Sequence, residues 1–346
     1  MATASKYSKK AVKPLAVVTG VTGYIGARTA EAQLEAGVFV RGTSRDISTS
    51  RVRALIEHFG KRFPGKFEVI QVPDITVPGA FDDVVKDATC IAHLAGPILS
   101  ALSDGPEPTI HVAVNGTLQI LESAHKEDSV ENFVYMSSAR AIRPHYADKG
   151  RTYTESDWNE EAEGYVEFWG AQARGTVVYA ASKVAAERAL WKFCDERDPR
   201  FSVTAINPGH DIFTCAGPDN VQKILVFLDF RDFVDVRDVA CLVVFASKPY
   251  NRHEVDRKRF VAAPHHCPLR AIARILAYYY PSIMDFAKSP FAGSRREVDR
   301  TYTKRNAFKS NESVRLSEEG YIPWEKTLVD TVEAMRSFLQ RNQHHV

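Results

Sequence analysis

A tyrosine and a lysine four residues apart, Tyr179 and Lys183, are well suited to transfer a proton. The segment Val177–Arg197 predicts a helix, and this spacing places both side chains on one helix face. A free tyrosine titrates at about 10, but a neighbouring ammonium stabilises the phenolate and lowers the pKa into a working range. Because such pairs also occur by chance on protein surfaces, the assignment needs a second feature.

Two serines at the end of a strand supply that feature. Phe133–Ser137 is a compact apolar run that predicts a buried strand, and Ser138 follows it directly. In open α/β sheets, ligands bind at the carboxyl ends of the strands, so these hydroxyl groups are expected at a ligand-binding edge. Tyr179 and Lys183 therefore gain weight as catalytic candidates.

A glycine-rich turn, Thr19–Gly26, lies between the first predicted strand and the first predicted helix. Gly20 permits a tight turn, Gly23 lets the backbone approach a pyrophosphate, and Gly26 lets helix and strand pack closely. The amides and the dipole of the helix then face the phosphate. This order of strand, turn and helix predicts a dinucleotide-binding site.

The end of the second predicted strand indicates which dinucleotide binds. NAD-selective sites place a carboxylate here to bind the ribose 2′-hydroxyl. In this chain Ser44 occupies that position, with Arg41 and Arg45 close by, and these groups suit a 2′-phosphate. The sequence therefore favours NADP(H) over NAD(H), although a shift of one residue in register would restore an acid, Asp46.

Strand and helix signals alternate through the first half of the chain, which predicts an α/β fold with a Rossmann-type, doubly wound parallel sheet. The predicted strands are Leu15–Thr19, Val38–Thr43, Phe67–Val72, Thr89–Ala95, Phe133–Ser137, Phe201–Ile206 and Arg259–Ala262. The predicted helices are Ala27–Ala36, Arg51–Phe59, Phe81–Lys86, Val112–Ala124, Val177–Arg197, one beginning near Val236, and Leu328–Gln340. We expect the dinucleotide-binding domain to take residues 14–209 and 231–263, with a cap excursion at 140–170. A small, interleaved, mainly helical substrate cap would take residues 210–230 and 264–346.

The composition excludes several classes of function. The 346 residues carry a net charge of +2, so no broad basic field favours nucleic acid. No apolar run approaches the ~20 residues of a membrane helix, and the basic N-terminus lacks the apolar stretch of a signal peptide. Five scattered cysteines and the contiguous His265, His266 and Cys267 show no metal-ligand spacing, so we expect no metal, buried thiols and a cytoplasmic location.

Together, the glycine turn, the strand-end serine and the Tyr-x-x-x-Lys helix resemble the short-chain dehydrogenase/reductase superfamily, in its extended, NAD-dependent epimerase/dehydratase-like branch. Within that branch, the chain is most similar to the group of dihydroflavonol, cinnamoyl-CoA and fungal carbonyl reductases. The resemblance covers about residues 15–262. It rests on Thr19–Gly26, Asp74–Ile75, Ala95–Pro97, Asn115–Thr117, Ser137–Ala139, Asp157–Trp158, Tyr179–Lys183, Asn207–Gly209 and Phe233–Ala240.

The resemblance implies a role for each matching residue. Tyr179 would donate a proton to the substrate carbonyl oxygen, and Ser138 would hydrogen-bond that oxygen. Lys183 would bind the nicotinamide ribose and lower the tyrosine pKa, while Asp74 and Ile75 would flank the adenine. The cofactor site would be formed by Gly20, Thr22, Gly23, Tyr24, Ile25, Gly26, Ser44, Arg45, Asp74, Ile75, Ala95, Gly96, Pro97, Tyr179, Lys183, Pro208 and Gly209.

The resemblance further implies NADPH-dependent reduction of an aldehyde or ketone, or the reverse oxidation of an alcohol, by a monomer or homodimer that acts on a small molecule. One alternative is a nucleotide-sugar epimerase or dehydratase, which needs a larger cap than the short excursion Gly209–Phe230 provides. The other is a noncatalytic NADP sensor, although such proteins often lose the tyrosine or the lysine. The chain also departs from simpler members of the superfamily, because Ala113 stands where they carry a catalytic asparagine. We interpret the nearby Asn115 as structural.

Overall fold

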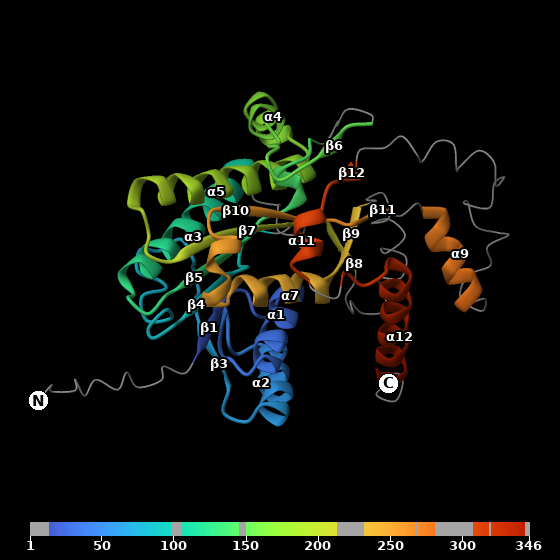
Figure 1. Cartoon of the computed structure of the whole chain (residues 1–346), viewed down its shortest axis with the longest axis horizontal. Helices are drawn as coiled ribbons and strands as arrows, with labels where there is room; N and C mark the ends of the chain where they lie inside the picture. The colour runs from blue at the N-terminus through green and yellow to red at the C-terminus, as the bar shows by residue number, and fades with distance from the viewer. Residues whose placement is uncertain are drawn as a thin grey trace, which may run out of the picture.

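A seven-stranded parallel sheet forms the centre of the molecule (Figure 1). The computed structural model describes residues 14–97, 105–144, 150–212, 232–266, 269–280, 307–317 and 320–342. The strands run in the order β10-β7-β5-β4-β1-β2-β3, and every neighbouring pair is parallel. Their bounds are β1 Leu15–Val18, β2 Phe39–Ser44, β3 Phe67–Gln71, β4 Cys90–His93, β5 Asn132–Met136, β7 Ser202–Pro208 and β10 Lys258–Ala262. The order reverses between β1 and β4, where doubly wound sheets bind ligands, so the predicted Rossmann-type fold is confirmed.

Helices cover both faces of this sheet because its strands are apolar on both faces. The neighbours Val17 and Val18 are both fully buried, but they belong to different hydrophobic clusters. Val17 packs with residues of α3 and α5, whereas Val18 packs with residues of α1, α2 and α7. These helices span Tyr24–Glu35 (α1), Ser50–Arg62 (α2), Pro106–Lys126 (α3), Gly175–Arg197 (α5) and Val236–Ala246 (α7).

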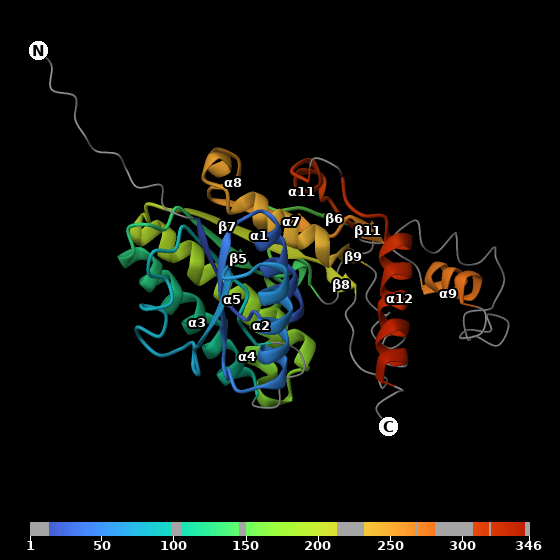
Figure 2. The same cartoon turned by 90° about the horizontal axis from the view of Figure 1, so that it is seen from below.

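Smaller elements lie around the large sheet. β9 pairs in parallel with β8 and antiparallel with β11, and β6 pairs in parallel with β12. These strands are β6 Thr152–Tyr153, β8 His210–Ile212, β9 Asp232–Asp235, β11 His265–His266 and β12 Ala307–Phe308. The remaining helices are α4 Glu161–Trp169, α8 Arg252–Val255, α9 Leu269–Tyr279, α11 Asn311–Arg315 and α12 Trp324–Asn342, with short 3₁₀ turns at Ala139–Ala141 (η2), Gly170–Gln172 (η3) and Pro249–Asn251 (η5). In both views α9 and α12 lie side by side at one end of the molecule (Figures 1 and 2).

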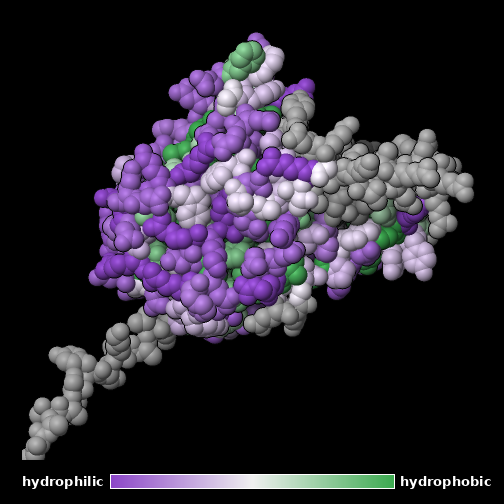
Figure 3. Space-filling view, turned by 45° about the horizontal axis from the view of Figure 1, so that its top comes forward, coloured by the Kyte–Doolittle hydropathy of each residue, from purple (hydrophilic) through white to green (hydrophobic). Residues whose placement is uncertain are grey.

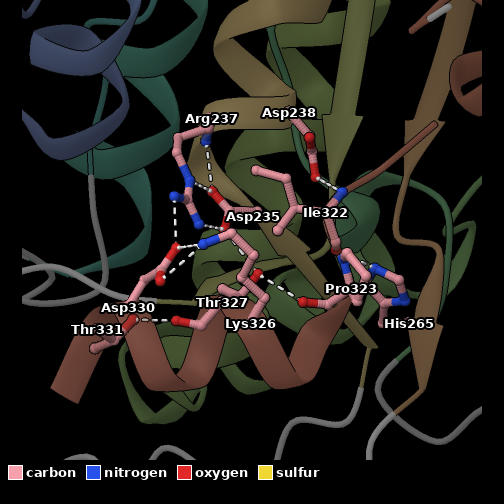
Figure 4. Close-up of polar contacts among 10 residues, drawn as sticks. All are labelled: Asp235, Arg237, Asp238, His265, Ile322, Pro323, Lys326, Thr327, Asp330 and Thr331. Carbon is pink, nitrogen blue, oxygen red and sulfur yellow. Dashed lines mark hydrogen bonds and ion pairs between the residues drawn. The ribbon is translucent and has the colours of Figure 1, made fainter. Parts of the chain in front are cut away.

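Polar contacts fasten the start of α12 to the start of α7 (Figure 4). Asp235 caps α7 by accepting a hydrogen bond of 2.8 Å from the amide of Arg237. Its carboxylate also accepts a bond of 2.7 Å from the hydroxyl of Thr327, and Arg237 pairs with Asp330 at 2.7 Å. Although burial opposes ionisation, the bonds from Arg237 and Thr327 lower the pKa of Asp235. We call this set, together with Asp238, His265 and Ile322, the C-terminal junction.

Asp238 is the other buried acid of the C-terminal junction. It accepts a hydrogen bond of 2.9 Å from the amide of Ile322, whose carbonyl lies 2.8 Å from Nε2 of His265. A helix N-terminus normally favours an ionised acid. Here burial dominates and raises the pKa of Asp238 to about 7, with a smaller contribution from Asp235.

Most of the predicted elements are present, with ends that differ by a few residues. The predicted helix Phe81–Lys86 is wrong, because this segment forms turns between two residues at positive φ, Gly79 (77°) and Asp87 (61°). The pattern also missed the short strands β8 and β9. Cys90 and Cys194 are buried as expected, whereas Cys241 is exposed.

The cap is only partly covered by the described residues. Residues 213–230, 267–268, 281–306, 318–319 and 343–346 of the expected cap lie outside them, and so do Cys215 and Cys267. The domain boundaries therefore stay a prediction.

Within the described part of the chain, no helix is long and apolar enough to cross a membrane. Hydrophilic side chains cover most of the face in Figure 3, and hydrophobic residues appear there as small separate patches.

Candidate active site

The carboxyl ends of β1, β4, β5 and β7 meet at one edge of the sheet. The residues that follow these four strands are the glycine turn Gly20–Gly26, Ala95–Pro97, Ser137–Ser138 and Gly209, which comes directly after Pro208. We call these segments the carboxyl edge, and we include in it the residues at the ends of β2 and β3 and the two catalytic candidates of α5, namely Ser44, Arg45, Asp74, Ile75, Tyr179 and Lys183. The fold therefore brings together the segments that the sequence predicted to hold a cofactor.

The glycine turn disfavours side chains at two positions. Gly20 has φ of 65°, and an added Cβ would lie 3.2 Å from the backbone of Ala95. A Cβ at Gly26 would lie 2.2 Å from the carbonyl oxygen of Gly20. Gly23 caps α1 without a side-chain hydrogen bond, so Tyr24 and Ile25 begin the helix at the end of the turn. This close-packed turn fits the approach of a pyrophosphate to the first helical amides.

A threonine and a histidine hold β1 and β4 together beneath the glycine turn. The Thr19 hydroxyl oxygen accepts bonds of 2.9 Å from the amides of Leu94 and Ala95, and it lies 3.0 Å from Nδ1 of His93. Because both lone pairs are used, the hydroxyl donates its hydrogen to Nδ1, and the proton of the neutral ring is on Nε2. Burial, and then the charge of Lys183, lower the pKa of His93 to about 3. Neither residue had a role of its own in the prediction from sequence. The available signal was a histidine near the end of an apolar strand.

Two arginines, Arg41 within β2 and Arg45 directly after it, were candidates for binding a 2′-phosphate. Arg41 pairs with Glu68 at 2.6 Å and donates to the carbonyls of Val84 and Lys86, so its contacts are structural. Arg45 is exposed beside Ser44, whose hydroxyl donates to the carbonyl of Asp46 at 3.1 Å. Of the two arginines, Arg45 is the one that remains a phosphate ligand candidate.

Asp74 and Ile75 lie after β3, next to α3. The Asp74 carboxylate accepts bonds of 2.8 Å from the amide and 2.7 Å from the hydroxyl of Thr76. These bonds lower the pKa of Asp74, with a smaller contribution from Arg45. Gly116 of α3 makes room for Ile75, because a Cβ there would lie 2.5 Å from the Ile75 side chain. Asn115 donates to the carbonyl of His111 at 3.0 Å, which agrees with a structural role.

The three predicted catalytic residues lie on the turn that follows β5 and on α5. Lys183 donates to the carbonyl of Met136, the last residue of β5, at 2.9 Å. Its ammonium nitrogen lies 5.9 Å from the centre of the Tyr179 ring. Ser138 caps the η2 turn, because its Oγ accepts a bond of 3.1 Å from the amide of Arg140. This bond orients the hydroxyl and leaves its hydrogen available for an acceptor.

A buried polar network lies behind these residues. Glu187, two helical turns after Tyr179, is completely buried and pairs with Arg259 at 2.6 Å. Its carboxylate also accepts bonds from the Ser137 hydroxyl and, at 2.9 Å, from the Asn207 amide. Asn207 in turn donates to the Ser138 carbonyl at 3.2 Å. The network therefore fixes the ends of β5 and β7 against α5, and no local pattern in the sequence predicted it.

A small pocket reaches Ser138. Pro208 and Gly209 line it, together with Ala139, Arg140, Arg143, Asp232 and Phe308. Gly209 is required here, because a Cβ would lie 2.6 Å from the Asp232 carbonyl oxygen. A larger open hollow lies between Trp158, Glu160 and the outer side of α5, but none of Ser138, Tyr179 and Lys183 lines it. The described residues contain no group of His, Cys, Asp and Glu that could hold a metal ion.

Comparison with known proteins identifies the family. The model of the NAD dependent epimerase/dehydratase family matches residues 16–223, which is more than half of the chain. The chain belongs to this family. The chain is 31% identical over 345 residues to a putative uncharacterized oxidoreductase of Schizosaccharomyces pombe. The matched residues cover 93% of this chain and 99% of that protein.

Two named reductases are also similar to this family member. Aldehyde reductase 2 of Sporidiobolus salmonicolor is 35% identical over 208 residues, which cover 59% of this chain and 60% of that reductase. The crystal structure of yeast methylglyoxal/isovaleraldehyde reductase with NADPH has a TM-score of 0.76 and 25% identity, and the match covers 94% of this chain and 99% of that one. The resemblance to this branch and to fungal carbonyl reductases is therefore confirmed.

Proposed function

We propose that this family member reduces the carbonyl group of an aldehyde or ketone with NADPH, or oxidises the corresponding alcohol with NADP. The observation that supports this most directly is the placement of Lys183 between β5 and Tyr179, with Ser138 at the end of the same strand. Similar proteins include an aldehyde reductase and a methylglyoxal/isovaleraldehyde reductase solved with NADPH.

Tyr179 donates the proton and Ser138 holds the oxygen that receives it. The Ser138 hydroxyl already accepts the Arg140 amide, so it donates its hydrogen to the carbonyl oxygen of the substrate. This bond strengthens as negative charge develops on that oxygen. The Lys183 ammonium favours the phenolate that remains when Tyr179 has given up its proton. When bound, NADPH supplies the hydride.

The residues of the carboxyl edge fit that cofactor. Gly20, Gly23 and Gly26 bring the backbone and the start of α1 to the pyrophosphate. Ser44 and Arg45 hold the 2′-phosphate, and Asp74 and Ile75 flank the adenine. Ala95, Gly96, Pro97, Pro208 and Gly209 line the nicotinamide end.

Two alternative functions, a nucleotide-sugar epimerase or dehydratase and a noncatalytic NADP sensor, are compared with the proposed reductase by measuring turnover. A nucleotide-sugar epimerase or dehydratase needs groups that bind a diphosphate, and a sensor needs NADP binding without turnover. Turnover on a panel of aldehydes and ketones, measured as consumption of NADPH, separates the carbonyl reductase from both alternatives.

Tyr179→Phe removes the proton donor and leaves the ring in place. NADPH binding, measured by fluorescence, should stay close to that of the unmodified protein, while turnover should fall by about 10²–10⁴-fold. A variant that keeps more than about a tenth of the activity would contradict the role of Tyr179.

A further inference from the structure

The side chain of Asn207 contacts the backbone of Ser138 at the carboxyl edge. Asn207 lies in β7 and is completely buried. Its amide nitrogen donates to the Ser138 carbonyl at 3.2 Å and to the Glu187 carboxylate at 2.9 Å. Because a carbonyl and a carboxylate can only accept, the nitrogen and not the oxygen of the amide has to face them. A rotated amide would lose both bonds, so the network specifies one orientation of Asn207.

The backbone ladder between β5 and β7 stops just before Ser138. Its last bond runs from the Ser137 amide to the Ile206 carbonyl at 2.8 Å. In a parallel ladder the next donor on β7 would be the amide of residue 208, but Pro208 has no amide hydrogen. The side chain of Asn207 therefore links β7 to Ser138 at a place where the backbone cannot.

Glu187 holds the Asn207 amide in this orientation. Its carboxylate is completely buried on α5 and pairs with Arg259 at 2.6 Å. The Arg259 guanidinium also donates to the carbonyls of Glu155 and Asp157, at 2.8 and 2.6 Å. Hydrogen bonds that involve a charged group are short and strong, so they fix the carboxylate on which Asn207 rests.

The position of the Ser138 hydroxyl depends on the backbone that carries it. Its Oγ accepts from the Arg140 amide at 3.1 Å, and its carbonyl accepts from the Ala141 amide at 2.9 Å. Both bonds lie within the turn after β5, so they shape this turn but do not tie it to the sheet. The bond from Asn207 ties the turn to β7 and, through the buried network, to α5.

We propose that Asn207 is a positioning residue for the reaction: it holds the backbone of Ser138 where the serine hydroxyl can donate to the same carbonyl oxygen that receives the proton of Tyr179. The inference rests on the proposed function, because Asn207 acts through Ser138. Without Asn207 the hydroxyl can move away from the oxygen on which charge develops, and a displacement of about 1 Å can cost about 10²-fold in rate.

A cycle of single and double variants tests the proposal. We measure kcat and KM at saturating NADPH with the carbonyl compound of the panel that the unmodified protein reduces fastest. Ser138→Ala should lower kcat by about 10²–10³-fold, the value of one donor to a developing oxyanion. Asn207→Ala should lower kcat by about 10–10²-fold with little change in KM. The combined variant should be no slower than Ser138→Ala alone, because no hydroxyl remains to be positioned.

Asn132→Ala is the matched control. Asn132 is also completely buried and joins the same two strands, because its side-chain nitrogen donates to the Ser202 hydroxyl at 2.7 Å. It is the first residue of β5, so it lies at the opposite edge of the sheet from Ser138. Asn132→Ala should lower the midpoint of urea unfolding, as Asn207→Ala should, but leave kcat unchanged. NADPH binding checks that each variant is folded, and Asn207→Ser, which keeps a hydroxyl donor, enters the cycle if Asn207→Ala does not fold.

Several results would overturn the proposal. If Asn207→Ala keeps the kcat of the unmodified protein, if Asn132→Ala shares its loss, or if the losses of the two single variants multiply in the combined variant, Asn207 only stabilises the fold. The proposed function then stands. If Ser138→Ala keeps full activity, or if no carbonyl compound is reduced although NADPH binds, the proposed function fails and the inference fails with it.

Discussion

The carboxyl edge and the C-terminal junction both contain buried polar side chains, but they use them in different ways. In the junction, the groups bond to one another: Asp235 accepts bonds from Arg237 and Thr327, and Asp238 accepts one from the amide of Ile322. At the carboxyl edge, the Ser138 hydroxyl accepts one backbone bond and has a hydrogen left to donate into a pocket. The difference separates side chains that hold the fold from side chains that can hold a ligand.

Two adjacent serines mark the boundary between these uses. The Ser137 hydroxyl donates to Glu187 within the buried network, whereas Ser138 lines the pocket. The buried network of Ser137, Glu187, Asn207 and Arg259, which we call the rear of the carboxyl edge, is therefore built like the junction. Only the outer layer, which contains Ser138, is open to a ligand. Substitutions on the two sides of this boundary should differ in their effect on stability.

The largest effect is expected for Glu187→Gln, which should lower the free energy of unfolding because it disrupts the buried network at the rear of the carboxyl edge. The variant leaves Arg259, whose side chain is 9% exposed, without its carboxylate. Breaking a buried pair from one side costs about 3–5 kcal/mol in the free energy of unfolding. Urea unfolding measures this, and Glu196→Gln, at an exposed position of the same helix, should cost less than about 0.5 kcal/mol. Equal stabilities of the two variants would show that the buried network around Glu187 does not stabilise the fold.

A smaller effect, on binding alone, is expected for the outer residue Arg45. Arg45→Ala should weaken NADPH binding by about 10–100-fold, the value of one charge-assisted hydrogen bond, and leave NADH binding nearly unchanged. Fluorescence titration measures both, and Arg53→Ala on the exposed side of α2 is the control. The midpoint of urea unfolding should not move. If the unmodified protein prefers NADH, Asp46 binds the ribose and the assignment of Arg45 is wrong.

A third effect concerns Asp238 and depends on pH. Its pKa in the folded protein, about 7, lies above that of an unfolded aspartate, so the folded state binds more protons between about pH 4 and 7. Stability should therefore fall as the pH rises through this window. Asp238→Asn has no carboxyl to ionise and should be more stable than the unmodified protein by about 1–3 kcal/mol at pH 8. That advantage should shrink toward pH 4, and an advantage independent of pH would contradict the account of the junction.

The sequence predicted the carboxyl edge better than the junction for a physical reason. Gly20, Gly26, Tyr179 and Lys183 act through local conformation or through spacing on one helix, and both can be recognised in a linear pattern. The pairing of Glu187 with Arg259 joins residues 72 positions apart, and no local pattern signals it. The same holds for the contact between Asp235 and Thr327.

The wrong helix prediction and the contacts of Arg41 also have identifiable causes. The helix predicted at Phe81–Lys86 had the right apolar residues, but they pack from a series of turns. Arg41 had a suitable charge near the cofactor position, but its side chain pairs with Glu68 of the neighbouring strand. Charge and hydrophobicity in a sequence indicate which residues can act, whereas the fold decides which partner each one meets.

The most direct test of the proposed chemistry is the pH–rate profile of Lys183→Met. The rate is measured for oxidation of an alcohol at saturating NADP. If the ammonium of Lys183 favours the phenolate of Tyr179, the unmodified protein should become active as a group titrates well below about 10, the value of a free tyrosine. In Lys183→Met the midpoint should move up toward that value, and the rate at neutral pH should fall by about 10²-fold or more. A variant with the unmodified midpoint would contradict the account, because Lys183 would then not tune Tyr179.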